Sequence, residues 1–503
     1  MRLQVFAAPA VIGTAALVLL LCRLDNGRLW QDEAETALLA RSVLLHGEPL
    51  AFDGRNLIAQ EQGVEYDDHY RWKWHPWLPF YVVAASFYAF GESTFSARLP
   101  FALLGAATIV GTYILGRLAW KETAAAAWSA IVLTLCVPFL ILSRQCRYYS
   151  LSAFLGVLVL IAYFRWIHRK RFGAPLLFSA VVLLFYTNFA CVYTFLGGLG
   201  LHFLIWQRNR WRELAGWLML AALVCLPGAI WFSGSVYLAR YGSTMFHGAA
   251  YWQYFHSYMN QIRTYCAPFL LLEVPVICIC LHALRGTPQE CRDRPLWRDT
   301  SCLALVALSH LVMIPLVVPA PFFRYLVAIL PVMALLIGRI VTAAFQWHWG
   351  FGVAVLGLAL VRPECLDYGD ELLHPFRGPV DGIVEYLSAH GTSDELVVVT
   401  YEDLPVKFYT NLRVMGGLTG EDLSAARPPD WIIVRKNVVG AEKEAAVREF
   451  IDQEIERGQY EQIVLDVPDT RWQNREDPAE HLYRTSDVPD RVVLRRRRGG
   501  GQK

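Results

Sequence analysis

The chain has 503 residues, 55% hydrophobic and 13% aromatic, and a formal net charge of +2. Because this apolar content exceeds that of typical soluble proteins, the composition favours a membrane domain. The small net charge, with basic residues that interrupt apolar segments, argues against a nucleic-acid partner. All eleven cysteines lie at or before Cys365, mostly inside apolar segments, so no disulfide framework is expected.

The chain opens with an apolar segment, Val5 to Leu21, followed by a polar loop that begins at Arg23. No clear small-residue cleavage site precedes the loop, so we expect a retained membrane anchor. The loop carries nine acidic and four basic residues between positions 30 and 75. An acidic loop directly after a membrane anchor is the first candidate for a functional site.

Two adjacent carboxylates, Asp32 and Glu33, lie within about ten residues of the anchor. Acids so close to a bilayer are costly unless they are paired, hydrated or functional. The pattern from Ala34 to Leu45 predicts a helix, and its dipole favours acids at its N-terminus. Asp32 and Glu33 are therefore catalytic candidates, and ordinary helix capping is the alternative.

The loop returns to the membrane through an aromatic stretch that contains Lys73, Trp74 and His75. These residues could line a sugar or acceptor pocket, or the aromatic rings could belong to an interfacial belt. For His75, a metal or acid/base role and an interfacial role are left open. A divalent metal ion held by His75 and an acid is therefore one alternative, and no cofactor is required.

Apolar runs that approach the length of a spanning helix recur throughout the first 362 residues, and we expect eleven to thirteen spans. A further stretch, Trp77 to Phe90, is marginal in length. The runs lie at 5–22, 97–119, 122–142, 150–167, 173–190, 191–206, 213–232, 263–284, 300–318, 323–345 and 347–362.

Three arginine-rich loops interrupt these runs and are expected in the cytoplasm by the positive-inside rule. Their basic residues are Arg165, Arg169, Lys170 and Arg171; Arg208, Arg210 and Arg212; and Arg285, Arg292, Arg294 and Arg298. Counting from them puts the 143–150 connection, the turn from Pro319 to Arg324 and the C-terminal part outside, and also the 30–75 loop if the N-terminus is cytoplasmic. This parity holds only if Trp77 to Phe90 does not fully cross, or if the number of neighbouring spans differs from this count.

Two outer connections combine arginine with tyrosine: Arg147 with Tyr148, and Arg324 with Tyr325. An arginine at a membrane boundary can snorkel to headgroups, or it can bind a phosphate bidentately. We expect Arg324 to bind phosphate, whereas both alternatives stay open for Arg147.

The stretch from 363 to 503 mixes strand-like runs with one amphipathic helical pattern, Ala441 to Arg457. The strand-like runs are Leu396 to Tyr401, Trp431 to Arg435 and Val492 to Leu494. The predicted fold class is thus a polytopic α-helical membrane protein with a C-terminal soluble α/β domain. We expect two domains, 1–362 with its acidic outer loop 23–75, and 363–503 outside the cytoplasm.

At this point several motifs resemble those of the polyprenyl-phosphate-sugar-dependent glycosyltransferases, a superfamily that includes protein O-mannosyltransferases and the lipid A aminoarabinose transferase. The resemblance covers nearly the whole chain, and the order of the motifs carries most of its specificity. The motifs are WQDEAETALLAR (30–41), Gly47, His75–Pro76, FGESTFSARLP (90–100), RQCRYYS (144–150), RYLVAILP (324–331) and KFYT (407–410).

The resemblance implies a multispan transferase with an outward-facing active site. Asp32 would then be the catalytic base with Glu33 beside it, and Arg324 would contact the donor phosphate, with Arg147 and Tyr325 as further candidates. Lys73, Trp74, His75 and Tyr148 would line the sugar or acceptor pocket. Two departures are notable: Arg144 and Arg147 stand where relatives can have a second acid, and His75 stands where the aminoarabinose branch is expected to have an acid or lysine.

The expected activity is transfer of a sugar from a polyprenyl-phosphate donor to a lipid, glycan or protein acceptor, with inversion. The expected location is the bacterial inner or plasma membrane, in contact with membrane lipids. No convincing Walker or Rossmann signature is present, and a lipid-linked donor needs none. The alternatives are a glycan ligase or polymerase that uses a lipid-pyrophosphate donor, and a non-catalytic transporter or scaffold.

Overall fold

The structure is a computed structural model in which two compact units can be distinguished. Within the described residues, the first unit comprises 2–22 and 99–368, and the second comprises 23–98, 369–470 and 490–498. The structure describes residues 2–233, 248–268, 271–284, 295–318, 320–375, 377–424, 426–435, 441–470 and 490–498. Arg285, Arg292, Arg294 and Pro319, which the topology prediction used, lie outside these residues.

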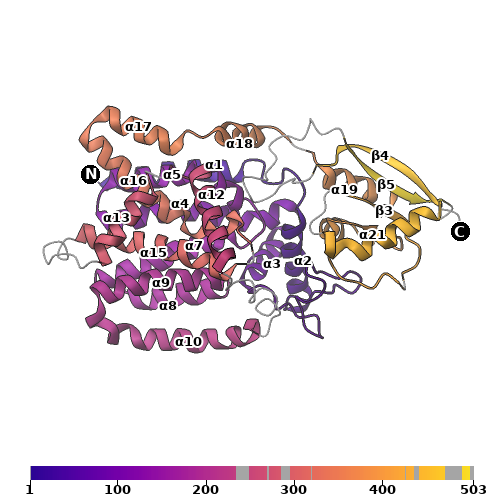
Figure 1. The fold of residues 1–503 in the computed structure, drawn as a ribbon, viewed down its shortest axis with the longest axis horizontal. Coiled ribbons are helices and arrows are strands. Elements are labelled where there is room, and N and C mark those ends of the chain that lie inside the picture. The colour runs from indigo at the N-terminus through magenta and orange to yellow at the C-terminus, as the bar shows by residue number, and fades with distance from the viewer. Residues whose placement is uncertain are drawn as a thin grey trace. The chain divides into compact units, whose positions relative to one another are not determined.

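The first unit consists of helices and is called the membrane unit below (Figure 1). Two helices, α4 and α18, cross the boundary between the units. Its elements are α1 (Arg2–Leu21), α4 (Thr94–Trp120), α5 (Thr123–Thr134), α6 (Val137–Ser143), α7 (Tyr149–Ile167), α8 (Gly173–Phe185), α9 (Phe189–Trp206), η1 (Arg208–Arg210), α10 (Trp211–Ser233), α12 (Gly248–Tyr265), α13 (Glu273–Leu284), α15 (Pro295–Val317), η2 (Phe323–Ile329), α16 (Leu330–Trp347), α17 (Trp349–Leu360) and α18 (Pro363–Leu373).

Six helices in the described part of the chain are long and apolar enough to cross a membrane, by length and composition. The number rises to eight if the bent pairs α5–α6 and α17–α18 are each one span. Four more apolar helices are shorter. The protein is therefore a polytopic membrane protein, as predicted, but fewer than the expected eleven to thirteen segments reach full spanning length.

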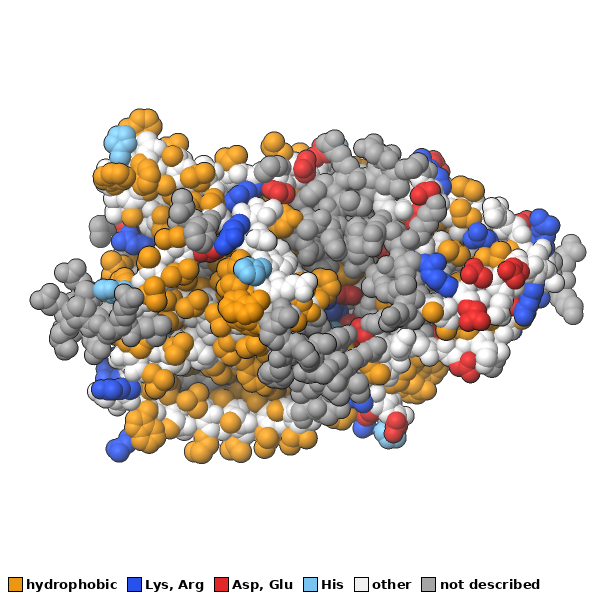
Figure 2. Space-filling model, in the orientation of Figure 1, with side chains coloured by type: hydrophobic (Ala, Val, Ile, Leu, Met, Phe, Trp, Pro, Cys, Tyr) orange, Lys and Arg blue, Asp and Glu red, His pale blue; other side chains and the backbone are white. Residues whose placement is uncertain are grey.

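The helices of the membrane unit differ in the share of their residues that is buried inside the unit. The span from η2 through α16 is 83% buried inside the unit, whereas the span that contains α10 is only 17% buried. Leu218, Met219 and Leu223 of α10 are at least half exposed, and hydrophobic side chains follow this helix in Figure 2. In a membrane protein such a face meets lipid, since exposed apolar surface of this extent is unusual in water.

The second unit combines the acidic loop with the C-terminal stretch. Its elements are α2 (Gln31–His46), α3 (Leu78–Phe90), α19 (Pro379–His390), β1 (Leu396–Val399), α20 (Asp403–Tyr409), β2 (Arg413–Gly416), β3 (Trp431–Ile433), α21 (Ala441–Glu456), β4 (Tyr460–Pro468) and β5 (Arg491–Arg497). The predicted helix after Asp32 is confirmed as α2, which begins earlier, so both acids lie in its first turn.

Five strands form one mixed sheet in the order β2-β1-β3-β5-β4. The strands β2, β1 and β3 are parallel, and β5 is antiparallel to β3 and β4. The central strand β1 is buried on both faces. Its Val397 and Val399 pack in a core with α19 and α20, while Leu396 and Val398 pack with α21. The predicted α/β fold of the C-terminal stretch is confirmed. The strands β2 and β4 were not predicted.

The grouping of the acidic loop with the sheet differs from the expected boundary near residue 362. Its physical basis is a set of polar contacts between distant parts of the chain. The Asn56 side chain donates to the Leu412 carbonyl oxygen at 3.1 Å and accepts from the Val414 amide at 2.8 Å. The Gln62 amide donates to the Leu418 carbonyl oxygen at 3.1 Å.

The marginal stretch from Trp77 is largely the helix α3, which belongs to the second unit and packs against α2. Its 13 residues extend about 20 Å, less than the roughly 30 Å of a hydrocarbon core. This length favours the alternative in which the segment does not fully cross.

Candidate active site

The first turn of α2 places Asp32 between two residues with buried partners. Gln31 and Glu33 are both fully buried, whereas Asp32 is partly exposed. The Glu33 carboxylate also accepts the Trp30 amide at 3.3 Å, so it closes the helix start. The geometry of this turn therefore depends on what holds Gln31 and Glu33.

Glu33 is held by Arg98, from the first turns of α4, in a bidentate ion pair. The donor–acceptor distances are 2.8 Å from Nε to Oε1 and 2.7 Å from Nη2 to Oε2. Arg98 also donates at 3.1 Å to three backbone carbonyl oxygens of the preceding loop, those of Leu24, Asn26 and Gly27. These bonds satisfy a buried guanidinium and fix the entry into α2.

Gln31 is held by a second buried cluster on α20. Its amide nitrogen donates to Asp403 Oδ1 at 2.9 Å, and Asp403 Oδ2 accepts from Lys407 Nζ at 2.7 Å. Asp403 and Lys407 side chains are fully buried. Gly417, at φ +61°, allows the Asp403 carboxylate to approach, because a Cβ there would overlap it.

Asp32 therefore lies between two residues whose side chains are held by hydrogen bonds, and its own side chain is partly exposed. It also lies in the first turn of a helix, where the helix dipole stabilises its charged form. Glu33, by contrast, has both oxygens engaged by Arg98. Of the two adjacent acids, Glu33 is fully buried and Asp32 is partly exposed.

A second acidic cluster, formed by Glu35 and Glu65, lies beside His75 at the aromatic end of the 30–75 loop. His75 Nδ1 is 3.7 Å from Glu35 Oε1, and Glu35 Oε2 accepts from Gln60 Nε2 at 2.7 Å. Trp72 and Trp74 pack near the His75 ring, with centroids 6.3 and 6.4 Å away. The Trp74 side chain is nearly buried, whereas that of His75 is partly exposed.

Glu65 completes this cluster. It is almost fully buried and accepts the backbone amides of Gln60 and Glu61. Its carbonyl oxygen accepts the Lys73 amide at 2.8 Å. Burial, reinforced by the charge of Glu35 and opposed by the backbone hydrogen bonds, raises the pKa of Glu65 to about 7.

The metal alternative finds little support in the geometry. Among the residues that the structure describes, no group of three or more His, Cys, Asp or Glu could hold a metal ion. Protein-bound catalytic metals usually have three protein ligands, a number that the described residues around Glu35 and His75 do not supply. The residues do not fit a metal site, so no catalytic step is assigned to one.

The arginine–tyrosine candidates of the membrane unit come together. Tyr148 precedes α7, and electrostatic interactions link it to Tyr325, Arg324 and Arg147. The Arg147 guanidinium is 5.7 Å from the Tyr148 ring centroid, and the Arg324 guanidinium is 5.5 Å from that of Tyr325. Two cations and two phenols of two separate connections thus form one cluster.

The turn that carries Arg324 is anchored through the backbone of the next residue. His310 Nε2 lies 2.8 Å from the Tyr325 carbonyl oxygen, and Thr194 Oγ1 lies 2.8 Å from His310 Nδ1. Because a carbonyl oxygen only accepts, His310 Nε2 donates the hydrogen bond to Tyr325. The relay connects η2 with α15 and α9.

Arg144 has a different environment from Arg147. Its Nη1 donates to the carbonyl oxygens of Leu19 and Leu20 at 3.0 Å, at the C-terminal end of α1. An arginine at this position satisfies carbonyl groups that the helix leaves open. Arg144 is therefore a helix-capping residue, and Arg147 is the one that joins the tyrosine cluster.

The sequence candidates thus form two groups, one within each unit. Asp32, Glu33, Lys73, Trp74 and His75 belong to the second unit, and Arg147, Tyr148, Arg324 and Tyr325 to the membrane unit.

Sequence reasoning missed the roles of Arg98, Asp403, Glu65 and His310. A signal existed for Arg98, which lies in the FSARLP motif next to an apolar span. An arginine beside an apolar span is rarely buried unless it pairs with an acid, so a pair between Arg98 and an acid such as Glu33 could have been predicted. Nothing in the sequence pairs the other three residues with their partners.

The site and fold together define a class: multispan membrane proteins with an acidic loop after the first helix. No protein-family model matches the chain. Its sequence is 24% identical over 379 residues to the undecaprenyl phosphate-alpha-4-amino-4-deoxy-L-arabinose arabinosyl transferase of Pseudomonas aeruginosa strain PAO1, a match over 69% of this chain. That match spans 62% of the relative's length. The Pseudomonas paraeruginosa enzyme of the same name is 25% identical.

Solved structures share the fold. ArnT from Cupriavidus metallidurans, bound to undecaprenyl phosphate, superposes with a TM-score of 0.55 and 15% identity, with 98% of each chain covered. The archaeal oligosaccharyltransferase AglB from Archaeoglobus fulgidus superposes with a TM-score of 0.59 and 12% identity, over 86% of this chain and 70% of AglB. The chain therefore shares the fold of these two solved structures, and its sequence is similar to that of the aminoarabinose transferases, as the resemblance implied.

Proposed function

We propose that this chain is a glycosyltransferase that moves a sugar from a polyprenyl-phosphate donor to an envelope acceptor. The observation that carries the proposal is Asp32, a partly exposed carboxylate between two neighbours with buried partners. The likeness to the aminoarabinose transferases supports the donor class. Because the match covers 62% of those relatives, their acceptor and sugar are not transferred to this chain.

In the proposed reaction Asp32 removes a proton from the acceptor hydroxyl or amine. The acceptor atom forms a bond to the anomeric carbon, while the bond from that carbon to the phosphate oxygen breaks. The electron pair leaves with the polyprenyl phosphate, and direct displacement inverts the anomeric carbon. Glu33 holds the turn through Arg98 and does not need to exchange protons.

Arg324 binds the departing phosphate and stabilises its growing negative charge. Arg147 and the phenols of Tyr148 and Tyr325 are further donors to phosphate oxygens. Their proximity in one cluster supports this assignment. The relay from His310 to the Tyr325 carbonyl oxygen positions the turn.

Lys73, Trp74 and His75 are assigned to the sugar or acceptor pocket. Aromatic rings stack on sugar C–H faces, and a partly exposed histidine beside Glu35 offers a polar contact. Because Trp74 is nearly buried, His75 and Lys73 are the more accessible of the three.

We also propose that the second unit faces the non-cytoplasmic side. The basic residues of the loops at 165–171 and 208–212 support this orientation through the positive-inside rule. The two-domain division, with a membrane domain and an outer α/β domain, is part of the same proposal.

Purified protein in lipid nanodiscs tests the activity with polyprenyl-phosphate sugars extracted from the native membrane. We expect time-dependent loss of the lipid-linked sugar and release of polyprenyl phosphate, measured by mass spectrometry. Sugars attached to envelope acceptors should disappear in cells that lack the protein. Release of polyprenyl pyrophosphate would instead support the ligase or polymerase alternative, and an intact donor with a transported substrate would support the transporter.

A further inference from the structure

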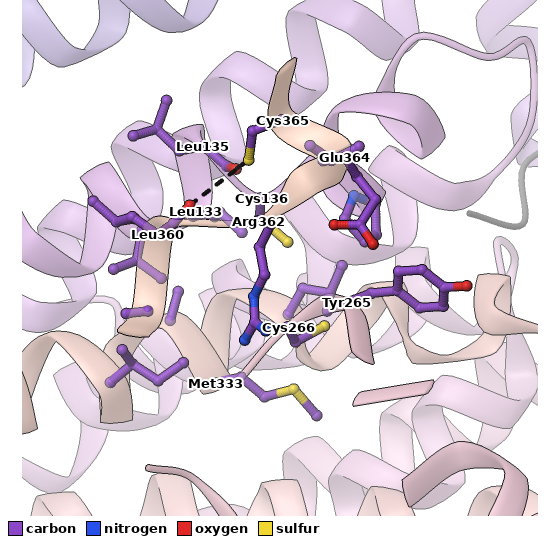
Figure 3. Close-up of a pocket in the computed structure, with 17 residues that line it drawn as sticks. Leu133, Leu135, Cys136, Tyr265, Cys266, Met333, Leu360, Arg362, Glu364 and Cys365 are labelled. Atoms are coloured by element: carbon purple, nitrogen blue, oxygen red, sulfur yellow. Dashed lines mark hydrogen bonds between the residues drawn. The ribbon is translucent and has the colours of Figure 1, made fainter. Parts of the chain in front are cut away.

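A cavity in the membrane unit, separate in its residues from the candidate active site, surrounds Arg362 (Figure 3). Seventeen residues line it. Most of its walls are apolar and come from α5, α16 and α17, with Leu330, Met333 and Ile337 on one face of α16. The polar lining is formed chiefly by Arg362, Glu364, Tyr265 and three cysteines.

Both bent helix pairs of the described chain meet at this cavity. Cys136 lies at the break between α5 and α6, where the helices bend by 65°, and Arg362 lies at the break between α17 and α18, where they bend by 61°. Breaks in membrane helices release backbone polar groups, which are tolerated where they line a cavity. Paired broken helices are therefore a sign of a binding site.

Arg362 carries a charge that its surroundings do not balance. Its Nε and Nη2 atoms are buried and make no hydrogen bond with any residue that the structure describes. No described carboxylate forms an ion pair with it. The neighbouring thiols are weak partners, and an arginine stays charged at physiological pH. Arg362 as a whole is partly exposed, but two buried donor nitrogens without acceptors are costly, so a bound anion would stabilise this arrangement.

Glu364 also lines the cavity and has to be compatible with an anion. In Figure 3 its carboxylate extends toward the Tyr265 side of the cavity, and the Arg362 guanidinium extends toward Cys266 and Met333. The two charged ends therefore occupy different parts of the cavity. An anion on the guanidinium side does not have to displace the carboxylate.

A second, apolar cavity shares one lining residue, Met333, with the Arg362 cavity. Phe255, Ile262 and Leu311 line it. The one acid of its wall, Glu273, is already paired with Arg263 at 2.8 and 2.7 Å. This space suits a hydrocarbon chain and offers no free charge to a polar ligand.

The position of Arg362 fits a lipid rather than a water-soluble anion. It lies two residues after the end of the apolar helix α17, and the next helix, α18, carries several acids, so Arg362 lies at the end of an apolar segment. Arginine at such a boundary reaches phosphate headgroups. The Tyr265 ring also contacts the ring of Phe323, the residue before Arg324, at 6.0 Å.

We propose that the Arg362 cavity binds the phosphate of an anionic lipid, with part of the lipid chain in the apolar cavity beyond Met333. The guanidinium binds the phosphate oxygens with Nε and Nη2, the geometry of bidentate recognition. Two lipids share this chemistry: a polyprenyl phosphate and a phospholipid. The site is additional to Arg324, and it does not depend on the transferase activity.

Native mass spectrometry of the delipidated full chain tests the site, with undecaprenyl phosphate, phosphatidylglycerol and inorganic phosphate titrated as separate probes. We expect Arg362→Gln to weaken lipid binding by at least about ten-fold and Arg362→Lys by less, because lysine keeps the charge without the fork. Arg169→Gln removes an arginine that is 73% exposed, and it should leave binding unchanged.

The three probes distinguish the sources. A loss confined to undecaprenyl phosphate assigns the site to the carrier lipid, and a loss confined to phosphatidylglycerol assigns it to the bilayer. Binding of inorganic phosphate that Arg362→Gln removes supports the anion site itself and shows that the chain is dispensable. Unchanged affinity for all three probes in a folded Arg362→Gln variant overturns the proposal. None of these assays involves sugar transfer, so a failure of the proposed activity would not alter them.

A second measurement uses the wild-type protein and covers the case of a misfolded variant. Cys365 lines the cavity, whereas Cys278 on α13 is exposed and belongs to neither cavity. Bound lipid should slow the alkylation of Cys365 by N-ethylmaleimide and leave Cys278 unaffected. Equal rates at Cys365 with and without saturating lipid would place the lipid elsewhere and contradict the proposal.

Discussion

Glu33 and Arg98 form a bidentate ion pair, with distances of 2.8 and 2.7 Å, in which both side chains are at most 4% exposed. The pair joins the first turn of α2 to the start of α4. A buried pair of this kind specifies a geometry more than it adds net stability. Here it determines the position of the neighbouring Asp32 carboxylate.

Breaking the pair should destabilise the protein strongly. Arg98→Ala leaves the Glu33 carboxylate buried without its cation, at a cost of roughly 3 to 5 kcal/mol. We expect lower yield and a lower midpoint of thermal unfolding in detergent. Glu33→Gln combined with Arg98→Met removes both charges and should recover part of this loss. A wild-type unfolding midpoint for Arg98→Ala would show that the pair does not hold the turn.

Asp32→Asn should lower the transfer rate by at least about a hundred-fold, because the amide cannot act as a base. Shape is preserved and Asp32 is partly exposed, so the unfolding midpoint should stay near that of the wild type. The rate of polyprenyl phosphate release measures the effect. Glu61→Gln, an exchange in the same loop outside the α2 turn, is the matched control. Turnover of Asp32→Asn near the wild-type rate would remove Asp32 from the mechanism.

The donor contact predicts a graded series at Arg324. Arg324→Lys should keep part of the activity and Arg324→Ala very little, since losing a charged hydrogen bond to a desolvated partner costs roughly 2 to 5 kcal/mol. Donor affinity should fall at least tens-fold for alanine. Arg144→Ala, which removes a cap of α1, should affect stability without affecting donor affinity. If Arg324→Ala binds donor lipid as wild type does, the contact must be sought at Arg147.

The buried carboxyl of Glu65 predicts a pH dependence of stability. Its pKa is raised from 4.5 to about 7 in the folded protein, mainly by burial. The folded state therefore binds more protons than the unfolded state between these values, and stability falls as pH rises from about 4.5 to about 7.

Glu65→Gln should remove this loss and raise the unfolding midpoint at pH 8, with little change at pH 4.5. The expected gain at pH 8 is on the order of 3 kcal/mol. Glutamine keeps an oxygen for the amides of Gln60 and Glu61. Scanning calorimetry from pH 4.5 to 8.5 measures the difference, and equal midpoints of both proteins at pH 8 would contradict it.

Orientation can be tested with single cysteines in a background cleared of reactive cysteines. Ser393 in the second unit is exposed, as is Asn209 in the basic 208–212 loop. Ser393→Cys should react with an impermeant maleimide in intact spheroplasts, and Asn209→Cys only after lysis. The reverse pattern would overturn the proposed topology.

Much of the fold follows from local patterns along the chain. The apolar runs predicted a multispan membrane protein, although fewer segments reach spanning length than expected, and the strand-like runs at Leu396 and Trp431 are β1 and β3. The runs that became β2 and β4 were missed. β2 is only four residues long, and β4 is largely exposed along its length, so neither has a strong alternating pattern.

The candidate site was only partly predictable for a related reason. Asp32 and Arg324 stand in motifs that local sequence can identify. The pairing of Gln31 with Asp403 joins residues separated by 372 positions, and that of Glu33 with Arg98 by 65. No local pattern records such a contact, since it forms only when distant segments pack.

The sequence by itself determined that the chain is a membrane protein with an acidic loop after its first apolar segment and an α/β tail, because hydropathy and periodicity are properties of neighbouring residues. Tertiary structure alone decided that Glu33 is fully buried and that Asp32 is partly exposed. A buried carboxylate is costly unless it is paired with a cation. Arg98 binds both oxygens of Glu33, and its guanidinium can make such a bidentate pair with one carboxylate. The same reason applies to Arg144 and Arg147, where the carbonyl groups of α1 take the first arginine and leave the second beside Tyr148.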